Sequence, residues 1–352
     1  MAAVLLLPQR VEAIAAQKAI LMDAGTGRVL YEKAADSRSL IASTTKIMTA
    51  LIVCEQCNVL DRMRIPKEAV GIEGSSMYLK EGEVLTLQEL LYGLMLQSGN
   101  DAAVALAIYC GGTVEGFAQL MNDKAHRLGL TGTHFENPNG LDSPDHYSTA
   151  RDLAVLTAYA MQNPIFAKTV STKTVRVGQR HLTNHNKLLW RVEGADGVKT
   201  GYTKASGRIL VSSAQRDGRR LVAVTINDGN DWADHAALLR DGFSRYTLRR
   251  IVAEGICLGR KEVLGGEADS VRLMAAESFS FPLATDEIPQ IVISGPEFTY
   301  APVVAGEDAG FAYICIADKC VGKVPLVYES TVEIKQPERK KHFWDGWFGG
   351  RK

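Results

Sequence analysis

Ser43 and Lys46 are the residues whose types and spacing most directly suggest catalysis. They open an apolar run at residues 47–53 that predicts a buried helix, and residues three positions apart lie on one helical face. A serine hydroxyl becomes a strong nucleophile when a neighbour takes its proton, and an amine can do so if a hydrophobic setting or another cation lowers its pKa. The pair predicts a nucleophile beside a base, although alone it also fits a helix cap followed by a solvated lysine.

A second polar group lies at Ser98, Gly99 and Asn100, between two stretches with helical periodicity. Glycine favours a turn here, from which the two polar side chains can project instead of lying on a helix surface. Serine and asparagine at a helix start are more often caps, so this group alone does not establish a site.

Lys199, Thr200 and Gly201 form a third group, before a strand-like run at residues 208–214. The charge of a lysine and the hydrogen bond of a hydroxyl suit a bound carboxylate, and a glycine lets a ligand lie against the backbone. By itself this group also fits an ordinary turn.

The elements that must position these groups form two blocks. Residues 19–23 and 28–32 predict a hairpin, a helical stretch follows, and residues 174–226 return to strands before a helix at about 232–246. Strands at both ends with helices between them predict an α+β fold, with an antiparallel sheet covered by helices and a helical subdomain. Beyond about Leu248 only short strand-like runs follow, which predicts a small all-β C-terminal domain.

Two helix starts are specific enough to check. Thr86 and Glu89 have the spacing of a capping box. Ser148 has the position of a cap for a helix that runs to Gln162.

Six cysteines are too few for a disulfide-stapled scaffold in a chain of 352 residues. Cys54 and Cys57 have metal-ligand spacing, but no second pair follows at a suitable distance, so we interpret them as core and surface thiols. Cys315 and Cys320 flank a short turn between apolar runs, where a hairpin disulfide can form if the protein is exported. We expect no metal and no other cofactor.

The composition is that of an ordinary globular protein. Of the 352 residues, 46% are hydrophobic and 23% charged, and the formal net charge is zero. A neutral chain is a poor partner for nucleic acid. No central stretch is long and apolar enough to span a bilayer, so any membrane attachment is expected from the ends of the chain.

The two ends suggest export and membrane attachment. Residues 1–16 resemble the end of a signal peptide without its basic leader, and an apolar N-terminal strand is the alternative. Residues 336–352 carry basic residues on either side of four aromatic residues that share one helical face, namely Phe343, Trp344, Trp347 and Phe348. This tail predicts an amphipathic anchor on an anionic membrane surface, with a disordered end or a strip packed on the β domain as alternatives.

In this order, the three polar groups resemble the signature of the penicillin-recognising serine acyl-transferases. Within that superfamily, residues 42–49, 96–102, 137–141 and 196–203 are similar to D-alanyl-D-alanine carboxypeptidases. The resemblance is close over residues 19–246 and extends by arrangement to the β domain and the tail. It implies a β-lactamase/transpeptidase-like fold.

The resemblance also implies a role for each catalytic residue. Ser43 would attack the carbonyl between two D-alanines, and Lys46 would take its proton. Ser98 would help to pass that proton to the leaving D-alanine. Asn100 would hold Lys46 and the substrate amide, and the charge of Lys199 would help to keep Lys46 neutral.

The substrate would be held by the third group and by backbone amides. Lys199 and Thr200, beside Gly201, would bind the terminal carboxylate, and the backbone N–H groups of Ser43 and Tyr202 would form an oxyanion hole.

One residue departs from the pattern of the family. Some relatives have an arginine near His185 that helps to hold the substrate carboxylate. A histidine is charged only at lower pH, so this contact is expected to be weaker here or made elsewhere.

The implied activity is removal of the terminal D-alanine from peptidoglycan pentapeptide stems through an acyl-enzyme on Ser43, with inhibition by β-lactam antibiotics. It implies an exported protein in the cell wall or on the outer face of the cytoplasmic membrane. The predicted parts of the chain are a signal-peptide remnant at 1–16, a penicillin-binding serine peptidase domain at 17–249, a β-rich domain at 250–335 and a basic aromatic tail at 336–352.

Two other functions fit parts of the pattern. A serine β-lactamase shares the acylation groups, but its commonest class positions water through a Glu-x-x-x-Asn spacing that Glu136 and Asn137 do not provide. The appended β domain also argues against a β-lactamase. A non-catalytic wall-binding protein on the same scaffold would be expected to have lost Ser43, Lys46 or Lys199, and all three are present.

Overall fold

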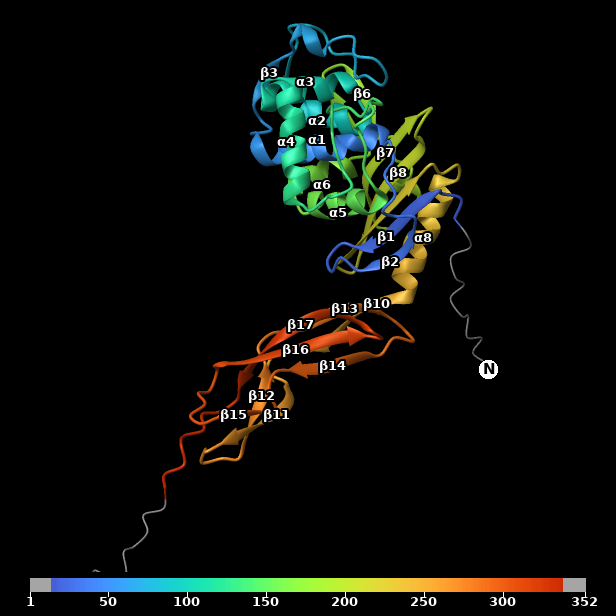
Figure 1. The fold of residues 1–352 in the computed structure, drawn as a ribbon. Coiled ribbons are helices and arrows are strands. Elements are labelled where there is room, and N and C mark those ends of the chain that lie inside the picture. The colour runs from blue at the N-terminus through green and yellow to red at the C-terminus, as the bar shows by residue number, and fades with distance from the viewer. Residues whose placement is uncertain (1–13, 338–352) are drawn as a thin grey trace, which may run out of the picture. The chain divides into compact units, whose positions relative to one another are not determined.

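The computed structural model describes residues 14–337, and the chain divides into two compact units, Met1–Tyr246 and Thr247–Lys352 (Figure 1). The described part of the first unit combines a sheet with helices, and that of the second contains strands without helices. The predicted α+β class with an all-β C-terminal domain is therefore confirmed. The predicted break between residues 249 and 250 lies three residues from this division and stays a prediction. Most of the predicted signal-peptide remnant and of the tail lies outside the described residues.

A five-stranded antiparallel sheet forms the centre of the first unit, in the order β2-β1-β9-β8-β7. Its strands are β1 Lys18–Asp23, β2 Val29–Lys33, β7 Ala195–Thr203, β8 Gly207–Arg216 and β9 Arg219–Ile226. Short turns join β1 to β2 and β7 to β8 to β9, so these neighbours must run antiparallel. Because β7 is the last strand in the order, one of its sides is an open edge of the sheet.

Helices cover both faces of this sheet (Figure 1). Helix α8, Asp231–Arg245, lies on one face, and the other face is covered by α1 Lys46–Gln56, α5 Ala150–Ala160 and α6 Pro164–Ser171. A further group of helices packs on α1 and α6 rather than on the sheet, namely α2 Leu87–Leu96, α3 Asn100–Gly111 and α4 Val114–Arg127. The short elements are the 3₁₀ turns η1 Ala42–Thr45 and η2 Lys67–Ala69, helix α7 Leu188–Arg191, and two hairpins, β3 Arg62–Arg64 with β4 Val84–Thr86 and β5 Thr174–Val177 with β6 Arg180–Thr183.

The alternation of side chains along the strands divides them between two cores. In β1, Ala19 and Leu21 belong to the core with α8, whereas Ile20 and Met22 belong to the larger core with the other helices. Helix α1 crosses that larger core and is buried at every residue from its start to Cys54. This confirms the buried helix that its apolar sequence predicted.

The two predicted helix starts have different outcomes. Thr86 and Glu89 form the predicted capping box, with Glu89 N donating to Thr86 Oγ1 at 3.2 Å and Thr86 N donating to Glu89 Oε2 at 2.8 Å. The prediction for Ser148 is wrong by one residue, because Thr149 caps α5. The backbone of Ser148 instead exchanges two hydrogen bonds with Ser39 in an isolated bridge.

The described part of the second unit consists of strands. They are β10 Tyr246–Val252, β11 Cys257–Leu264, β12 Ser270–Ala275, β13 Phe279–Ala284, β14 Pro289–Ser294, β15 Phe298–Tyr300, β16 Asp308–Ile316 and β17 Lys319–Tyr328. Six of them form one sheet in the order β14-β16-β17-β12-β11-β15, and β10 pairs with β13. Side chains such as Val263, Leu273 and Leu326 form the core under this sheet.

Two disulfides are present among the described residues. Cys315 and Cys320 join β16 to β17, as the hairpin pattern suggested. The interpretation of Cys57 as a thiol is wrong, because it pairs with Cys110 near the end of α3. Cys54 is free and buried.

Within residues 14–337, no single helix has the length and hydropathy to cross a membrane. Helices α3 and α4 reach that threshold only when taken together, and they are bent by 82° at their junction.

Candidate active site

The eight predicted site residues come together at one pocket of about 550 Å³ in the first unit. Five of them line it directly, namely Ser43, Ser98, Thr200, Gly201 and Tyr202. The other three, Lys46, Asn100 and Lys199, are buried and connect to these five through hydrogen bonds or along the chain.

Ser43 lies in the 3₁₀ turn η1, one turn before α1, rather than in the helix itself. Strand β7 passes very close to this turn at Gly201. A Cβ atom on Gly201 would lie 3.3 Å from both Ala42 Cβ and Ile41 O. Glycine at this position therefore lets β7 approach the turn that carries Ser43, a reason that differs from the predicted space for a ligand.

The Lys46 amine has three oxygen neighbours. Its Nζ lies 2.9 Å from Ser43 Oγ, 2.7 Å from Asn100 Oδ1 and 2.6 Å from the carbonyl oxygen of Asn139. A neutral amine has two N–H bonds and one electron pair. Since the amide and carbonyl oxygens can only accept, they take the two N–H bonds, and the electron pair is left for the Ser43 hydroxyl. This is the geometry that a general base requires.

The surroundings of the two buried lysines favour their neutral forms. Burial lowers the pKa of Lys46 well below its usual value, and the charge of Lys199 lowers it further, while the Asp101 carboxylate acts in the opposite direction. Burial lowers the pKa of Lys199 to about 7. Lys46 can therefore be neutral when Lys199 still carries a proton for part of the time.

Asn100 holds the Lys46 amine and a loop at the same time. Its Nδ2 donates to the carbonyl oxygen of Glu73 at 2.6 Å, which fixes the side-chain amide with Oδ1 towards Lys46. The backbone N–H of Asn100 also donates to the carbonyl oxygen of Ser75 at 2.7 Å. Because Ser75 lines the pocket, one residue connects the Lys46 amine to the pocket wall.

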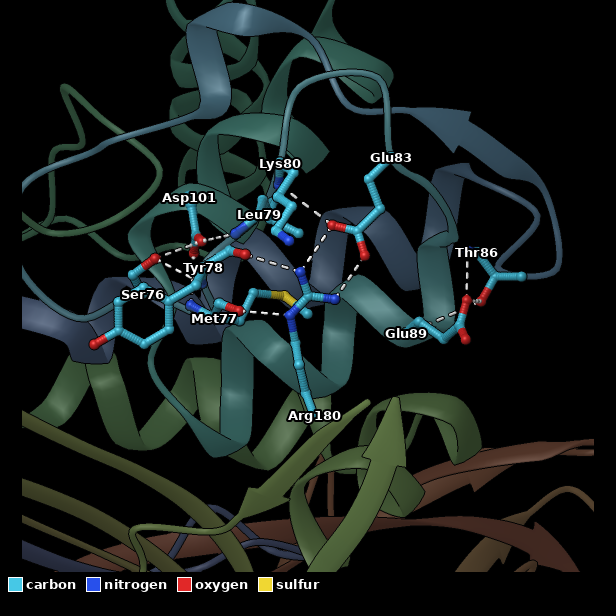
Figure 2. Close-up of polar contacts among 10 residues, drawn as sticks. All are labelled: Ser76, Met77, Tyr78, Leu79, Lys80, Glu83, Thr86, Glu89, Asp101 and Arg180. Carbon is cyan, nitrogen blue, oxygen red and sulfur yellow. Dashed lines mark hydrogen bonds and ion pairs between the residues drawn. The ribbon is translucent and has the colours of Figure 1, made fainter. Parts of the chain in front are cut away.

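Figure 2 shows how the same loop continues over the start of α3. The buried carboxylate of Asp101 accepts hydrogen bonds from Ser76 Oγ and from the backbone N–H groups of Met77 and Leu79. Arg180, from β6, donates to the carbonyl oxygens of Met77 and Tyr78 and makes a bidentate ion pair with Glu83. The loop is thus fixed from two sides by charge-assisted hydrogen bonds.

Ser98 and Lys199 form a second serine–lysine pair in the pocket. Lys199 Nζ donates to Ser98 Oγ at 3.0 Å and to the carbonyl oxygen of Thr200 at 2.9 Å. The turn was predicted to depend on the flexibility of Gly99, but Ser98 has the left-handed backbone, with φ of 61°. Gly99 is needed for space, because a Cβ there would lie 2.7 Å from Asp101 Oδ1.

Other pocket residues were not found from the sequence. Arg208 lines the pocket and forms a bidentate ion pair with Asp231, and Lys187 and Trp232 line it as well. Arg208 lies opposite Tyr202 in the β7–β8 pairing. Pairing the two predicted strands across their short turn would have placed Arg208 beside Tyr202 and therefore near the site.

His185 lines the same pocket, as the sequence comparison with the family suggested. Partial burial and then the charge of Lys199 lower its pKa, so it is uncharged at neutral pH. At neutral pH the lining side chains that carry positive charge are therefore Arg208 and Lys187 rather than His185.

The arrangement is suited to acyl transfer. It combines a hydroxyl nucleophile with a buried amine base, and a second lysine and an arginine offer positive charge to an anionic substrate. Among the described residues, no group of three His, Cys, Asp or Glu side chains could hold a metal ion.

Comparisons with known proteins agree on one family for both units. The model of the D-alanyl-D-alanine carboxypeptidase family matches residues 7–230, and the model of the penicillin-binding protein 5 C-terminal domain matches residues 246–334. The chain is 31% identical to the D-alanyl-D-alanine carboxypeptidase DacF of Bacillus subtilis over 93% of its own length and 87% of the relative. It is 35% identical to the D-alanyl-D-alanine carboxypeptidase DacD of Escherichia coli, over 89% of its own length and 86% of the relative.

Solved structures give the same result. Penicillin-binding protein 5 of Haemophilus influenzae superposes with a TM-score of 0.78 at 28% identity, covering 92% of this chain and 98% of that one. The D-alanyl-D-alanine carboxypeptidase DacD of Francisella tularensis superposes with a TM-score of 0.77 at 26% identity, covering 95% of this chain and 97% of that one.

The coupling between the two lysines is directly testable. Replacing Lys199→Met should raise the pKa of the Lys46 amine, because removing the neighbouring cation removes a repulsion that favours neutral Lys46. NMR titration of selectively labelled lysine side chains measures this pKa, and Lys46→Arg assigns the signal. Lys187→Met is the matched control, since Lys187 is an exposed cation on the same pocket and should leave the Lys46 signal in place. An unchanged or lower pKa in Lys199→Met would contradict the coupling.

Proposed function

Because the chain belongs to the D-alanyl-D-alanine carboxypeptidase family, we propose that Ser43, Lys46 and Ser98 carry out the reaction of that family here. The protein is a D-alanyl-D-alanine carboxypeptidase, which removes the terminal D-alanine from peptidoglycan stem peptides. The observation that supports these residues most strongly is the buried Lys46 amine, whose two N–H bonds are taken by acceptors and whose electron pair is left for Ser43 Oγ.

In the proposed first half-reaction, Ser43 Oγ attacks the carbonyl carbon between the two D-alanines and Lys46 takes the hydroxyl proton. The C–N bond then breaks, and Ser98 helps to pass that proton from Lys46 to the leaving D-alanine amine, which returns Lys46 to its neutral form. Water attacks the acyl-enzyme in the second half-reaction, with Lys46 again as the base, and releases the shortened stem peptide.

We propose that the terminal carboxylate of the substrate binds at Lys199 and Thr200. The Thr200 side chain lines the pocket, and Lys199 donates to Ser98 beside it. A bound carboxylate would favour the protonated form of Lys199, whose pKa of about 7 in the free protein leaves it easily charged. Arg208, with its charge held in place by Asp231, is the candidate for the contact that His185 does not supply at neutral pH.

The developing negative charge on the substrate carbonyl would be held by the backbone N–H groups of Ser43 and Tyr202. Both residues line the pocket, and Tyr202 is in the edge strand β7. The open side of this strand lets an extended peptide run alongside it.

The alternative of a β-lactamase of the commonest class has no support at Glu136. This residue is exposed, its carboxylate accepts a hydrogen bond from Ser143, and it is not among the residues that line the pocket with Ser43. The remaining alternative, a non-catalytic wall-binding protein, is decided by the acylation experiment below.

A location outside the cytoplasm fits the cell-wall substrate and the two disulfides, which form and persist in oxidising compartments. We further propose that the tail at residues 336–352 attaches the protein to the outer face of the cytoplasmic membrane. Most of this tail lies outside the described residues, and the proposal rests on its sequence alone.

Penicillin should acylate Ser43 and form a long-lived adduct, because its strained amide and its carboxylate match the same groups. Intact-mass measurement with peptide mapping should place the label on Ser43 and lose it in Ser43→Ala. Lys46→Ala should slow acylation by about two to four powers of ten, the usual contribution of a general base. Ser75→Ala and Lys187→Ala alter other pocket residues and serve as matched controls. Label that survives Ser43→Ala would refute the assignment, and an unlabelled wild type would favour the non-catalytic alternative.

The carboxylate site predicts a preference for substrates with a free C-terminus. A peptide ending in D-Ala-D-Ala should be cleaved by the wild type much faster than its C-terminal amide, and Lys199→Ala should reduce this preference. A hydrogen bond to a charged group contributes about 1.5–3 kcal/mol, which corresponds to about 10- to 150-fold. The ratio of kcat/KM for the free acid to kcat/KM for the amide measures this preference. Equal cleavage of both peptides by the wild type would show that Lys199 and Thr200 do not bind the carboxylate.

The tail predicts binding to anionic vesicles, to which each basic residue near the surface contributes about 1 kcal/mol. Truncation after Lys335 should release the protein from vesicles and leave the activity on soluble peptides unchanged. Co-sedimentation of the full-length and truncated proteins measures the difference, and neutral vesicles are the control. Equal co-sedimentation of the two forms would rule out the anchor.

A further inference from the structure

Residues 135–146 contain no helix or strand, yet they hold two side chains of α1. The carbonyl oxygen of Asn139 accepts from Lys46 Nζ at 2.6 Å, and that of Pro138 accepts from Thr49 Oγ1 at 2.6 Å. An irregular segment has no ladder of backbone hydrogen bonds to fix such carbonyls. Its position must therefore come from specific side-chain contacts.

His146 makes the contacts that tie this segment to the turn carrying Ser43. Its ring is buried, and its Nδ1 accepts the backbone N–H of Glu136 at 3.1 Å. A neutral imidazole with an accepting Nδ1 carries its proton on Nε2, so Nε2 donates to Thr45 Oγ1, which lies 2.7 Å away. Burial lowers the pKa of His146 to about 4, which keeps the ring in this neutral form at pH 7.

The segment also has no free space against the turn. Gly140 has a φ of 84°, and a Cβ there would lie 2.0 Å from the Ala42 carbonyl oxygen and 2.8 Å from Thr45 Oγ1. The two stretches therefore pack backbone against backbone at Gly140 and Ala42. A shift of one relative to the other changes the distance from Asn139 O to Lys46 Nζ.

We propose that His146 is a positioning residue for the general base. It holds the Thr45–Lys46 turn and the Asn139 carbonyl in one arrangement, which keeps the electron pair of Lys46 on the Ser43 hydroxyl. The inference rests on the proposed function, because it assumes that Lys46 is the base that activates Ser43.

The position of the Asn139 carbonyl matters because a neutral amine has only two N–H bonds, and both need an acceptor other than Ser43. If Asn139 O moves away, one N–H of Lys46 loses its acceptor, and the Ser43 oxygen becomes the nearest replacement. The amine then donates to the hydroxyl it should deprotonate. Misplacement of a catalytic group by about 1 Å can cost about 100-fold in rate.

Two variants separate the two hydrogen bonds of His146. His146→Asn keeps an acceptor near the position of Nδ1 and loses the donor to Thr45, whereas His146→Gln keeps a donor near Nε2. Thr45→Val removes the acceptor of the same bond without altering His146, and Thr45→Ser restores it. His134→Asn is the matched control, because His134 precedes the same segment and its ring bonds to the exposed carbonyl of Asp145.

The experiment measures the rate constant of Ser43 acylation by benzylpenicillin and the dissociation constant of the complex that precedes it. His146→Asn and Thr45→Val should each lower the rate constant about 10- to 100-fold with little change in the dissociation constant. Their effects should not add in the double variant, since both remove one bond. Thr45→Ser and His134→Asn should acylate at close to the wild-type rate, whereas His146→Gln should also be slowed, because it lacks the Nδ1 acceptor of the Glu136 N–H.

NMR titration of the Lys46 amine gives a readout that does not need acylation. Losing the Asn139 acceptor should lower the pKa of Lys46 further in His146→Asn, because a carbonyl acceptor favours the charged form. Wild-type rates and an unchanged Lys46 signal in folded His146→Asn and Thr45→Val would overturn the inference, as would a lower unfolding temperature with unchanged rates. If the wild type is not acylated, the proposed function fails, and the Lys46 signal still decides whether His146 positions the amine.

Discussion

The arrangement of the first unit depends on keeping a lysine amine buried and uncharged. Burying a charged amine costs several kcal/mol, so Lys46 is stable inside the protein only in its neutral form or with full hydrogen bonding. The Ser43, Asn100 and Asn139 oxygens satisfy the neutral amine completely. The second buried lysine, Lys199, adds repulsion that penalises the charged form further. The reactivity proposed for Ser43 is therefore a consequence of how Lys46 is buried.

Close backbone approach makes this burial possible. At three places around the pocket, a side chain in place of a glycine would be in the way. Gly201 lets β7 reach the turn η1, Gly140 lets the irregular segment reach it from another side, and Gly99 leaves room for the Asp101 carboxylate. Gly201 and Gly99 thus serve close approach, whereas Gly140 serves both close approach and a left-handed backbone, and turn propensities alone do not distinguish these reasons.

Residue type and spacing were enough to predict the fold class and the buried helix α1, because each carries a periodic signal. They only marked Ser43, Ser98 and Lys199 as candidates, and the resemblance to a family was needed to join these groups into one site. The Asn139 carbonyl could not be predicted as part of the site, because any residue supplies a main-chain carbonyl. His146 and Arg208 depend on packing and strand register across stretches distant in sequence. The Cys57–Cys110 disulfide was missed for the same reason, since it joins the ends of two helices that only the fold brings together.

The Asn100 side chain carries this dependence from the base to the pocket wall. Its amide has one oxygen, which accepts from Lys46, and one nitrogen, which donates to Glu73 O. The amide cannot rotate to improve one contact without losing the other. The orientation of the Lys46 amine and the position of the loop at Glu73 therefore depend on each other. Asp101, the next residue, holds the following part of that loop through Ser76, Met77 and Leu79. A displacement of the loop at Glu73 therefore bears on the Lys46 amine through the Asn100 side chain, which bonds to both.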